Sequence, residues 1–390
     1  MKDEFPKRLK WRAEAMGHSL ISFVMRKLPT KIVFRLGELL GKFIWPLMAA
    51  RQRIIMRNLR ILYAGKTHVV DMETLARAAF VRATANLVCS SGSSELPKGK
   101  LREMIEIENP GLMEEALAKK NGVVVLLSHM GNWELLTQLH RLFPNITKSG
   151  AFYRPLNNPI LNERILKKRE ADGTKLFSKR DSLHQVSGFL RENGVIGILA
   201  DQRAGWQGEM VPFFGRLTRA SPLPGLLVRR CKSEVLALSL RTVAPGKWSA
   251  RYHAVEMPYN SRNCMKALEQ AMQVSFVDVF WLQERWKFYI GKGSSPRDWM
   301  GKDDARGTLP HRALIWATSA ESELDLPQSC VHGDIEYEHG IDQGAGELEA
   351  IDRAKALPVD FIVIFSENPE LRMEAKRLGI PVYLAADSSE

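Results

Sequence analysis

His129 and Glu134 are the two residues of this chain whose types and spacing point most directly to catalysis. They follow an apolar run, 123–127, that is typical of a buried β-strand, and a polar turn with Gly131 separates this run from a stretch typical of a helix. A carboxylate in the first helical turn can accept the ring N–H of such a histidine and fix its tautomer. The outer ring nitrogen could then take a proton from a substrate hydroxyl, while backbone amides after Gly131 could stabilise an oxyanion.

The same two residues also allow a purely structural interpretation. A histidine and a glutamate at this spacing occur often by chance and could simply cap a turn and a helix. The choice depends on further motifs elsewhere in the chain. In chain order these are Arg51-Gln-Arg53, Arg57-Asn-Leu59, Phe152-Tyr-Arg-Pro155 with Asn158-Pro159, Gly197-Ile-Leu-Ala-Asp-Gln202, Val211-Pro-Phe-Phe-Gly215 and Gln283-Glu-Arg-Trp286.

In this order, the motifs resemble the bacterial lipid A biosynthesis acyltransferase family, the late or secondary lauroyl and myristoyl acyltransferases, over roughly residues 10 to 300. That family is part of a wider glycerolipid acyltransferase group with a His-x4-Asp/Glu motif, which His129 and Glu134 match. One segment departs from the pattern. Residues 218–223 only approximate the Thr and Gly that usually follow the Phe-Phe-Gly motif, a difference that concerns acyl-chain or donor preference rather than the reaction.

The resemblance implies transfer of a fatty acyl group from acyl carrier protein to a lipid A precursor, at the free hydroxyl of a 3-hydroxyacyl chain. His129 would be the general base and Glu134 the carboxylate that orients it, and direct attack on the thioester would avoid an acyl-enzyme. We expect Arg154 to bind a phosphate, Asp201 and Gln202 to position the acceptor, and an aromatic pair to form a wall of the acyl groove. The expected substrate-binding residues are Gly131, Asn132, Arg154, Asp201, Gln202, Phe213, Phe214 and Gly215.

Each of these residues also has a structural alternative, because Arg154 could form a salt bridge to a helix, Asp201 and Gln202 could cap a turn, and aromatic pairs are common in protein cores. Two other functions also stay open. The same fold could acylate another glycolipid or a phospholipid with acyl-CoA as donor, or the chain could be a non-catalytic basic protein that binds membranes or nucleic acid.

The charge of this chain is divided unevenly along its length. Residues 313–390 hold five Lys/Arg against sixteen Asp/Glu, a net charge of −11. Because the whole chain has a net charge of +12, residues 1–312 have a net charge of +23. A body this basic favours a polyanionic partner such as an anionic membrane, a phosphorylated lipid or an acidic carrier protein. Nucleic acid is not expected, because no zinc-finger spacing, aromatic RNA-binding motif or basic heptad array accompanies the charge.

The N-terminal 60 residues combine fourteen Lys/Arg with bulky apolar side chains, and no apolar run reaches the length of about 18 residues expected of a membrane-spanning helix. Such a segment can lie in the headgroup region of a bilayer, or it can pack on the enzyme core. We find no cleavable signal segment. The expectation is therefore a peripheral or monotopic protein on the cytoplasmic face of the inner (cell) membrane.

Metal and nucleotide sites are not indicated by the sequence. The four cysteines are scattered without a CxxC pair, which favours reduced thiols over a disulfide framework or a zinc site. The histidines are equally dispersed, and residues 1–312 contain neither a GxGxxG nor a Walker motif. We therefore expect no cofactor and no metal.

Alternation of short buried runs with helical segments predicts the α/β class, with a mostly parallel sheet flanked by helices, an N-terminal amphipathic helical region and a small C-terminal α/β unit. The predicted domains are 1–90, 91–300 and an acidic 313–390 of unknown role, with 301–312 as a linker. Helices are predicted at 8–28, 31–64, 71–90, 133–142, 158–171, 182–192, 221–231, 261–285, 344–357 and 368–378. Strands are predicted at 123–128, 147–153, 195–200, 234–240, 250–256, 313–317, 361–365 and 381–384.

Overall fold

The computed structural model describes residues 4–64, 70–93, 96–153, 155–171, 173–178, 181–289, 294–302, 305–342, 347–356 and 359–385. Contacts within the chain divide it into two compact units. The first comprises Met1–Ile55, Val69–Asp201 and Pro222–Gln283, and the second comprises Met56–His68, Gln202–Ser221 and Glu284–Glu390. The predicted boundaries at 90, 300 and 313 stay a prediction, but the second unit joins the acidic tail to three earlier segments of the chain.

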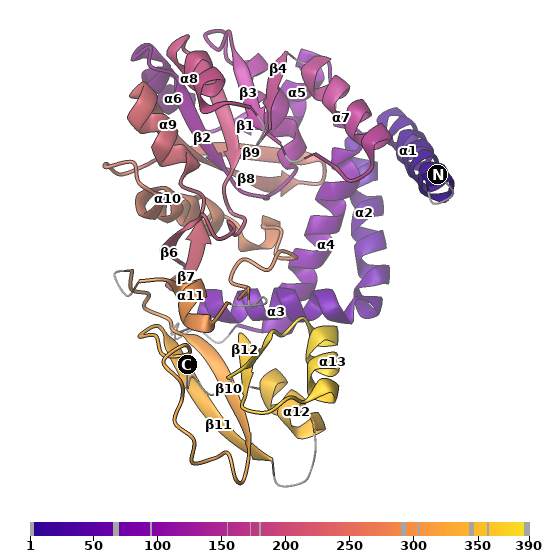
Figure 1. Ribbon diagram of the computed structural model, residues 1–390. Helices are drawn as coiled ribbons and strands as arrows, with labels where there is room; N and C mark the ends of the chain where they lie inside the picture. Colours follow the sequence, from indigo (N-terminus) through magenta and orange to yellow (C-terminus); the bar gives the residue numbers. More distant parts are fainter. Residues whose placement is uncertain are drawn as a thin grey trace. The chain divides into compact units, whose positions relative to one another are not determined.

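The first unit is built on a sheet whose described strands run in the order β1-β9-β8-β2-β5-β3-β4 (Figure 1). Every neighbouring pair is parallel except β8 and β9. Helices cover the sheet, so the predicted α/β class with a mostly parallel sheet is confirmed. The strands are β1 (Ile105–Ile107), β2 (Val123–Leu127), β3 (Ser149–Phe152), β4 (Thr174–Phe177), β5 (Val195–Leu199), β8 (Glu234–Ala244) and β9 (Lys247–Ala254).

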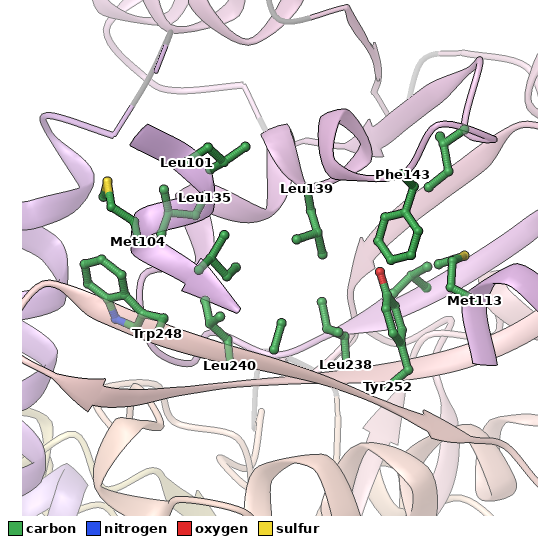
Figure 2. Close-up of a cluster of buried hydrophobic side chains, with 14 of the residues drawn as sticks. Leu101, Met104, Met113, Leu135, Leu139, Phe143, Leu238, Leu240, Trp248 and Tyr252 are labelled. Carbon is green, nitrogen blue, oxygen red and sulfur yellow. The ribbon is translucent and has the colours of Figure 1, made fainter. Parts of the chain in front are cut away.

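The central strands are apolar on both faces because both faces are buried. Along β2, Val123 and Val125 contribute to a large core cluster on one face, while Val124 and Leu126 are buried on the other. Figure 2 shows part of that cluster, in which side chains from β8 and β9, such as Leu238 and Tyr252, face side chains from the helical layer. That layer includes α2 (Thr30–Ile44), α4 (Met72–Ser90), α5 (Lys98–Met104), α6 (Pro110–Ala118) and the 3₁₀ helix η2 (Trp133–Leu142).

The remaining helices of the first unit complete its outer layers. The helix α10 packs against β8, β9 and β2, and α9 packs against β2 and β8. Their bounds are α7 (Pro159–Ala171), α8 (Leu183–Arg191), α9 (Leu223–Cys231) and α10 (Ser261–Gln273), followed by the 3₁₀ helix η3 (Phe276–Asp278). The helix predicted over 261–285 thus ends twelve residues early, and the segment after it approaches the end of β2.

The N-terminal region is helical, as predicted, but the prediction of a single helix over 31–64 is wrong. It is two helices, α2 and α3 (Ala49–Tyr63), separated by the 3₁₀ turn η1 (Trp45–Leu47), in which proline at position 46 cannot donate a helical hydrogen bond. The helix α1 (Glu4–Lys27) precedes them. The helices α2 and α4 lie side by side (Figure 1). Gly37 and Gly41 allow this close approach, since a Cβ added to Gly37 would lie 2.6 Å from the Cα of Ala85. Among the described residues, no helix combines the length and apolarity needed to span a bilayer.

The second unit contains a parallel sheet in the order β11-β10-β12-β13 and a separate antiparallel hairpin, β6–β7. The predicted C-terminal α/β unit is present, and it includes a strand, β11, that the sequence did not indicate because its polar residues outnumber its apolar ones. The elements are α11 (Pro296–Met300), α12 (Glu347–Ala356), α13 (Pro369–Leu378), β6 (Glu209–Phe213), β7 (Arg216–Ala220), β10 (His311–Thr318), β11 (Ile335–Asp342), β12 (Phe361–Ile364) and β13 (Val382–Leu384).

Candidate active site

The ends of β2 and β5 bring His129 and Asp201 together. The two strands are adjacent and parallel, with Leu127 opposite Leu199, so that both chains leave the sheet at the same edge. The backbone N–H of Ala200 donates to the carbonyl of Leu127 at 2.9 Å and extends this pairing beyond the last strand residue. Side chains one or two residues further along each chain must therefore lie side by side.

Asp201 holds His129 with both of its carboxylate oxygens. Its Oδ2 accepts the backbone N–H of His129 at 3.1 Å, and its Oδ1 lies 2.7 Å from the ring Nδ1. Because an ionised carboxylate can only accept, Nδ1 carries the proton and Nε2 carries the lone pair. The Asp201 side chain is fully buried, whereas 13% of the His129 side chain is exposed. A histidine held by a buried carboxylate in this way can act chemically as a general base.

The loop that carries His129 is fixed by the segment around η3. The carbonyl of His129 accepts the N–H of Phe280 at 2.7 Å, and the N–H of Gly131 donates to the carbonyl of Asp278 at 2.9 Å. Gly131 has φ +59°, and a Cβ at this position would lie 2.5 Å from the carbonyl oxygen of Leu240. Only glycine fits this close approach without displacing β8.

Two aromatic rings flank the His129 imidazole. The ring of Trp133 lies edge-on at 5.2 Å between centroids, and the ring of Phe280 lies 6.5 Å away. Trp133 and Phe280 also contact each other at 5.5 Å. These rings cover part of the imidazole, and reduced contact with water strengthens its interaction with Asp201.

Glu134 occupies a different position from the one that the sequence suggested. Its carboxylate oxygens lie 2.7 and 2.9 Å from Nη2 of Arg169, a residue of α7, and the carboxylate at Nδ1 of His129 is that of Asp201. The expected α-helix after Gly131 is the 3₁₀ helix η2, which has fewer residues per turn, so its first side chains point in different directions from those of an α-helix. The carboxylate that contacts the His129 ring is therefore that of Asp201 and not, as we expected, that of Glu134.

A cavity of about 90 Å³ lies between η2 and the sheet, lined by residues of the first unit. Polar groups of Glu134, Thr137, His140 and Arg169 form part of its wall. Most of the remaining wall is apolar and comes from η2 and the strands, with Val125, Leu127, Leu136, Leu139, Ile146, Phe152, Val195, Leu199 and Leu238 among its residues. Such a cavity has the chemistry to hold a hydrocarbon chain with a polar group at one end.

Comparison with known proteins identifies the family. The family described as bacterial lipid A biosynthesis acyltransferase matches residues 12–288. The chain belongs to this family. The resemblance seen in the order of the motifs is thereby confirmed, and the match ends before β10.

Three characterised relatives are similar over shorter stretches. The chain is 23% identical over 190 residues to the lipid A biosynthesis palmitoleoyltransferase of Escherichia coli (strain K12) and to the lipid A biosynthesis acyltransferase of Shigella flexneri. These alignments cover 48% of this chain and 60% of each relative. The phosphatidylinositol mannoside acyltransferase of Mycobacterium tuberculosis (strain ATCC 25618 / H37Rv) is 29% identical over 123 residues, which cover 30% of this chain and 37% of that protein.

Asn132, three residues after His129, has a buried side chain. Its Nδ2 donates to Oγ of Ser93 at 2.8 Å, which ties the His129 loop to the end of α4, while its Oδ1 is buried without a hydrogen-bond partner. The amide of Gly131 is already bonded to Asp278, so an oxyanion cannot use it without displacing that bond. Arg154 lies outside the described residues.

The other predicted site residues belong to the second unit. Gln202 is exposed. Phe213 is fully buried at the end of β6 and stacks on Trp286 at 5.7 Å, and Phe214 with φ +50° begins the turn of the hairpin. Gly215 completes that turn at φ +81°, where a Cβ would lie 2.6 Å from Oγ1 of Thr308. The structural alternative of an aromatic core fits the contacts of Phe213.

Arg169, Trp133 and Phe280 were missed as site residues by the sequence reasoning. Arg169 ends a basic run, Lys167-Lys-Arg169, that is typical of a solvated helix face, so its type and position carried no signal. Trp133 adjoins Glu134 within the motif itself, and its place next to His129 could have been noticed. Phe280 lay inside the predicted helix 261–285, which ends at Gln273 in the structure.

Proposed function

We propose that this protein is an acyltransferase that moves a fatty acyl group from the thioester of acyl carrier protein to a hydroxyl of a lipid A precursor. The observation that carries the proposal is the His129–Asp201 pair, in which a buried carboxylate lies 2.7 Å from Nδ1 of the imidazole. Membership of the lipid A acyltransferase family supports the acceptor class.

In the proposed reaction, Nε2 of His129 accepts the proton of the acceptor hydroxyl as its oxygen attacks the thioester carbonyl carbon. The imidazolium that forms is stabilised by the Asp201 carboxylate. The tetrahedral intermediate then collapses, the carbon–sulfur bond breaks, and the proton passes from Nε2 to the departing sulfur. Bond making and breaking balance without a cofactor, and no acyl-enzyme is formed. We assign oxyanion stabilisation to the amides of Asn132 and Trp133, at the positive end of η2.

We propose that the acyl chain of the donor binds in the cavity between η2 and the sheet. The apolar wall from β2, β5 and β3 suits a hydrocarbon chain, and Leu127 and Leu199, the last residues of two of these strands, belong both to the wall and to the strand ends that carry His129 and Asp201. We assign to Glu134 and Arg169 the positioning of polar substrate groups at this cavity, because their paired charges lie in its wall.

We further propose that the protein acts as a peripheral or monotopic protein on the cytoplasmic face of the inner membrane. The helix α2 supports this assignment because it buries Val33, Phe34, Gly37 and Gly41 and leaves large apolar side chains exposed elsewhere on its surface, with Phe43 73% exposed. The exposed apolar residues of α1 and α2 are Leu9, Met16, Leu20, Ile21, Phe23, Val24, Ile32, Leu36, Leu39, Leu40 and Phe43. Basic residues interleave with them, as expected of a helix at an anionic lipid surface.

A second acceptor class is favoured by one comparison. The similarity to a phosphatidylinositol mannoside acyltransferase supports a mannoside as the acceptor. We propose acyl-CoA as the alternative donor for this second class. The chemistry at His129 would be the same for both acceptors. Only the groups that bind the sugar and the donor carrier would differ.

The test uses the purified full chain with each donor and each acceptor. Acyl carrier protein and CoA thioesters of the same fatty acid are incubated with a lipid A precursor or with phosphatidylinositol mannoside, and products are identified by mass spectrometry. We expect acylation of the lipid A precursor, and a loss of about 10² to 10⁴ in turnover for His129→Ala, the range for removal of a general base. Near wild-type turnover of a folded His129→Ala variant would refute the mechanism, and acylation of the mannoside alone would transfer the proposal to the second acceptor class.

A further inference from the structure

A second cavity, of about 250 Å³, lies within the second unit and has a strongly basic lining. It is formed by the part of α3 that belongs to this unit, by β7, and by residues next to or within β10 and β11. The lining residues are Arg57, Arg60, Ile61, Ala64, Arg216, Leu309, Pro310, Arg312 and Glu336. Four of these nine are arginines, and one is acidic.

A buried aspartate beside this cavity holds two of the arginines. Asp360 forms ion pairs with Arg57 and, at 3.1 Å, with Nη1 of Arg216, and it also accepts from the backbone N–H of Arg312 at 3.0 Å. The same Oδ2 oxygen that contacts Arg216 and Arg312 also lies 3.0 Å from Nδ1 of His311. Asp360 and Glu336 together balance two of the four guanidinium charges. Two positive charges therefore remain along the lining of the cavity, where they repel each other.

Two guanidinium N–H groups in the cavity wall lack an acceptor. The Nε atoms of Arg57 and Arg216 are both buried and have no hydrogen-bond partner. Arg216 is only 8% exposed, so solvent does not replace the missing acceptor. Burial lowers the pKa of Arg216, Asp360 opposes this effect, and the neighbouring charges of Arg57 and Arg312 lower the pKa further. An anion with several oxygens in the cavity would relieve the repulsion and accept from the guanidinium groups that line it.

We propose that this cavity binds a phosphate group, either as inorganic phosphate or as the phosphomonoester of a lipid headgroup. A phosphate dianion matches the two uncompensated charges, and its terminal oxygens can accept from converging guanidinium groups in the paired geometry that arginine favours. A carboxylate would leave one charge unbalanced. The site is independent of the proposed acyl transfer, because it rests only on residues of the second unit.

Calorimetric titration of the full chain with inorganic phosphate, at constant ionic strength, tests the site. Arg60→Gln and Arg312→Gln each remove one lining charge at an exposed position, and we expect each to weaken binding by about tenfold, the effect of losing one charge-assisted hydrogen bond. Arg377→Gln is the matched control, because it removes an exposed arginine of α13 that is not part of the cavity. Glu336→Gln removes the acidic member of the lining and should strengthen binding, a gain that damage to the fold could not produce.

A parallel titration with dihexanoyl phosphatidic acid separates the two sources of phosphate. Tighter binding of this soluble lipid than of inorganic phosphate, with the same response to the four variants, would identify a lipid headgroup. Equal or weaker binding would identify free phosphate. The proposal is overturned if neither probe binds saturably, or if Arg377→Gln weakens binding as much as Arg60→Gln and Arg312→Gln do.

Discussion

At the scale of single residues, the site depends on which carboxylate reaches the imidazole. Asp201 bonds both the backbone and the ring of His129, whereas Glu134 pairs with Arg169 and borders the cavity. A carboxylate fully buried next to a histidine stabilises the imidazolium more than an exposed one, because the local dielectric is lower. We therefore assign orientation of His129 to Asp201 and substrate positioning to Glu134.

Substitution of the two carboxylates separates these roles. Asp201→Asn should lower turnover by about 10² to 10⁴, since an amide can donate to Nδ1 and favour the tautomer that protonates Nε2. Glu134→Gln should act mainly on KM, with a smaller loss of turnover. Steady-state kinetics on both variants, with circular dichroism as the control for folding, measures the difference. If Glu134→Gln lost more turnover than Asp201→Asn, the result would contradict this assignment and favour Glu134 as the carboxylate that orients His129.

At the scale of elements, the parallel pairing of β2 and β5 positions the candidate site. The N-terminal helices carry the exposed apolar side chains on which the proposed membrane association rests. The pairing of Leu127 with Leu199 fixes where His129 and Asp201 leave the sheet, and η3 clamps the loop between β2 and η2. The helix α2 approaches α4 closely at Gly37 and buries Val33 and Phe34, but it leaves other large apolar residues such as Phe43 exposed. These exposed side chains lie on the same helices as the basic residues of the N-terminal region.

Charge reversal on these helices tests the membrane assignment. Changing Arg26, Lys27, Lys31 and Arg35 to Glu should move the protein from anionic liposomes to the supernatant, because each basic residue near the surface contributes about 1 kcal/mol. Co-sedimentation at low and high salt provides the measurement. Reversal of four exposed residues elsewhere, Lys119, Lys167, Arg262 and Lys266, provides a control with the same change in net charge. Equal release by both sets would indicate a general electrostatic effect, and no release by the first set would remove the assignment.

At the scale of the whole molecule, the acidic tail shares its interior with earlier parts of the chain. Leu217, Phe288 and Trp299 join residues of β10 and β12 in one core cluster of the second unit. Asp360, just before β12, is paired with Arg57 and Arg216 from the matched region. The second unit thus depends on segments from both sides of the predicted linker.

Asp360 should make the stability of the protein sensitive to acid. Burial alone would raise the pKa of Asp360, but Arg57, Arg216 and His311 outweigh it and hold the pKa well below its usual range. Because the pKa of Asp360 is lower in the folded state than its unfolded value of about 3.9, the ionised carboxylate stabilises the folded protein at pH values above about 3.9. This contribution to the free energy of unfolding falls as the pH drops below about 3.9. Asp360→Asn should cost about 3 kcal/mol or more near neutral pH, since it leaves buried guanidinium groups without their counter-charge. Denaturant unfolding at several pH values should show this difference shrinking below pH 4, and a constant difference would contradict the assignment.

Truncation tests the predicted domain boundary. A chain that ends near Gly301 would fold independently if 313–390 were a separate accessory domain, as its composition suggests. The contacts of Asp360 and of the shared core predict instead that the truncated chain unfolds at a lower temperature than the full chain, because Arg57, Arg216 and Leu217 lose their buried partners. Differential scanning calorimetry of both chains measures the effect. An unchanged transition for the remaining residues would support the boundary drawn from the sequence.

The sequence by itself determined the fold class, the family and the place of His129 and Asp201 after buried strands, because these follow from local apolar patterns and from the order of short motifs. Tertiary structure alone decided that β2 lies beside β5 and that Asp201 reaches His129, since strand order and register depend on packing between segments 72 residues apart. The direction of Glu134 depended on η2 being a 3₁₀ helix, and the basic cavity on contacts between α3, β7 and the tail. These features could not be predicted, because packing between distant segments produces no hydrophobic periodicity in either segment.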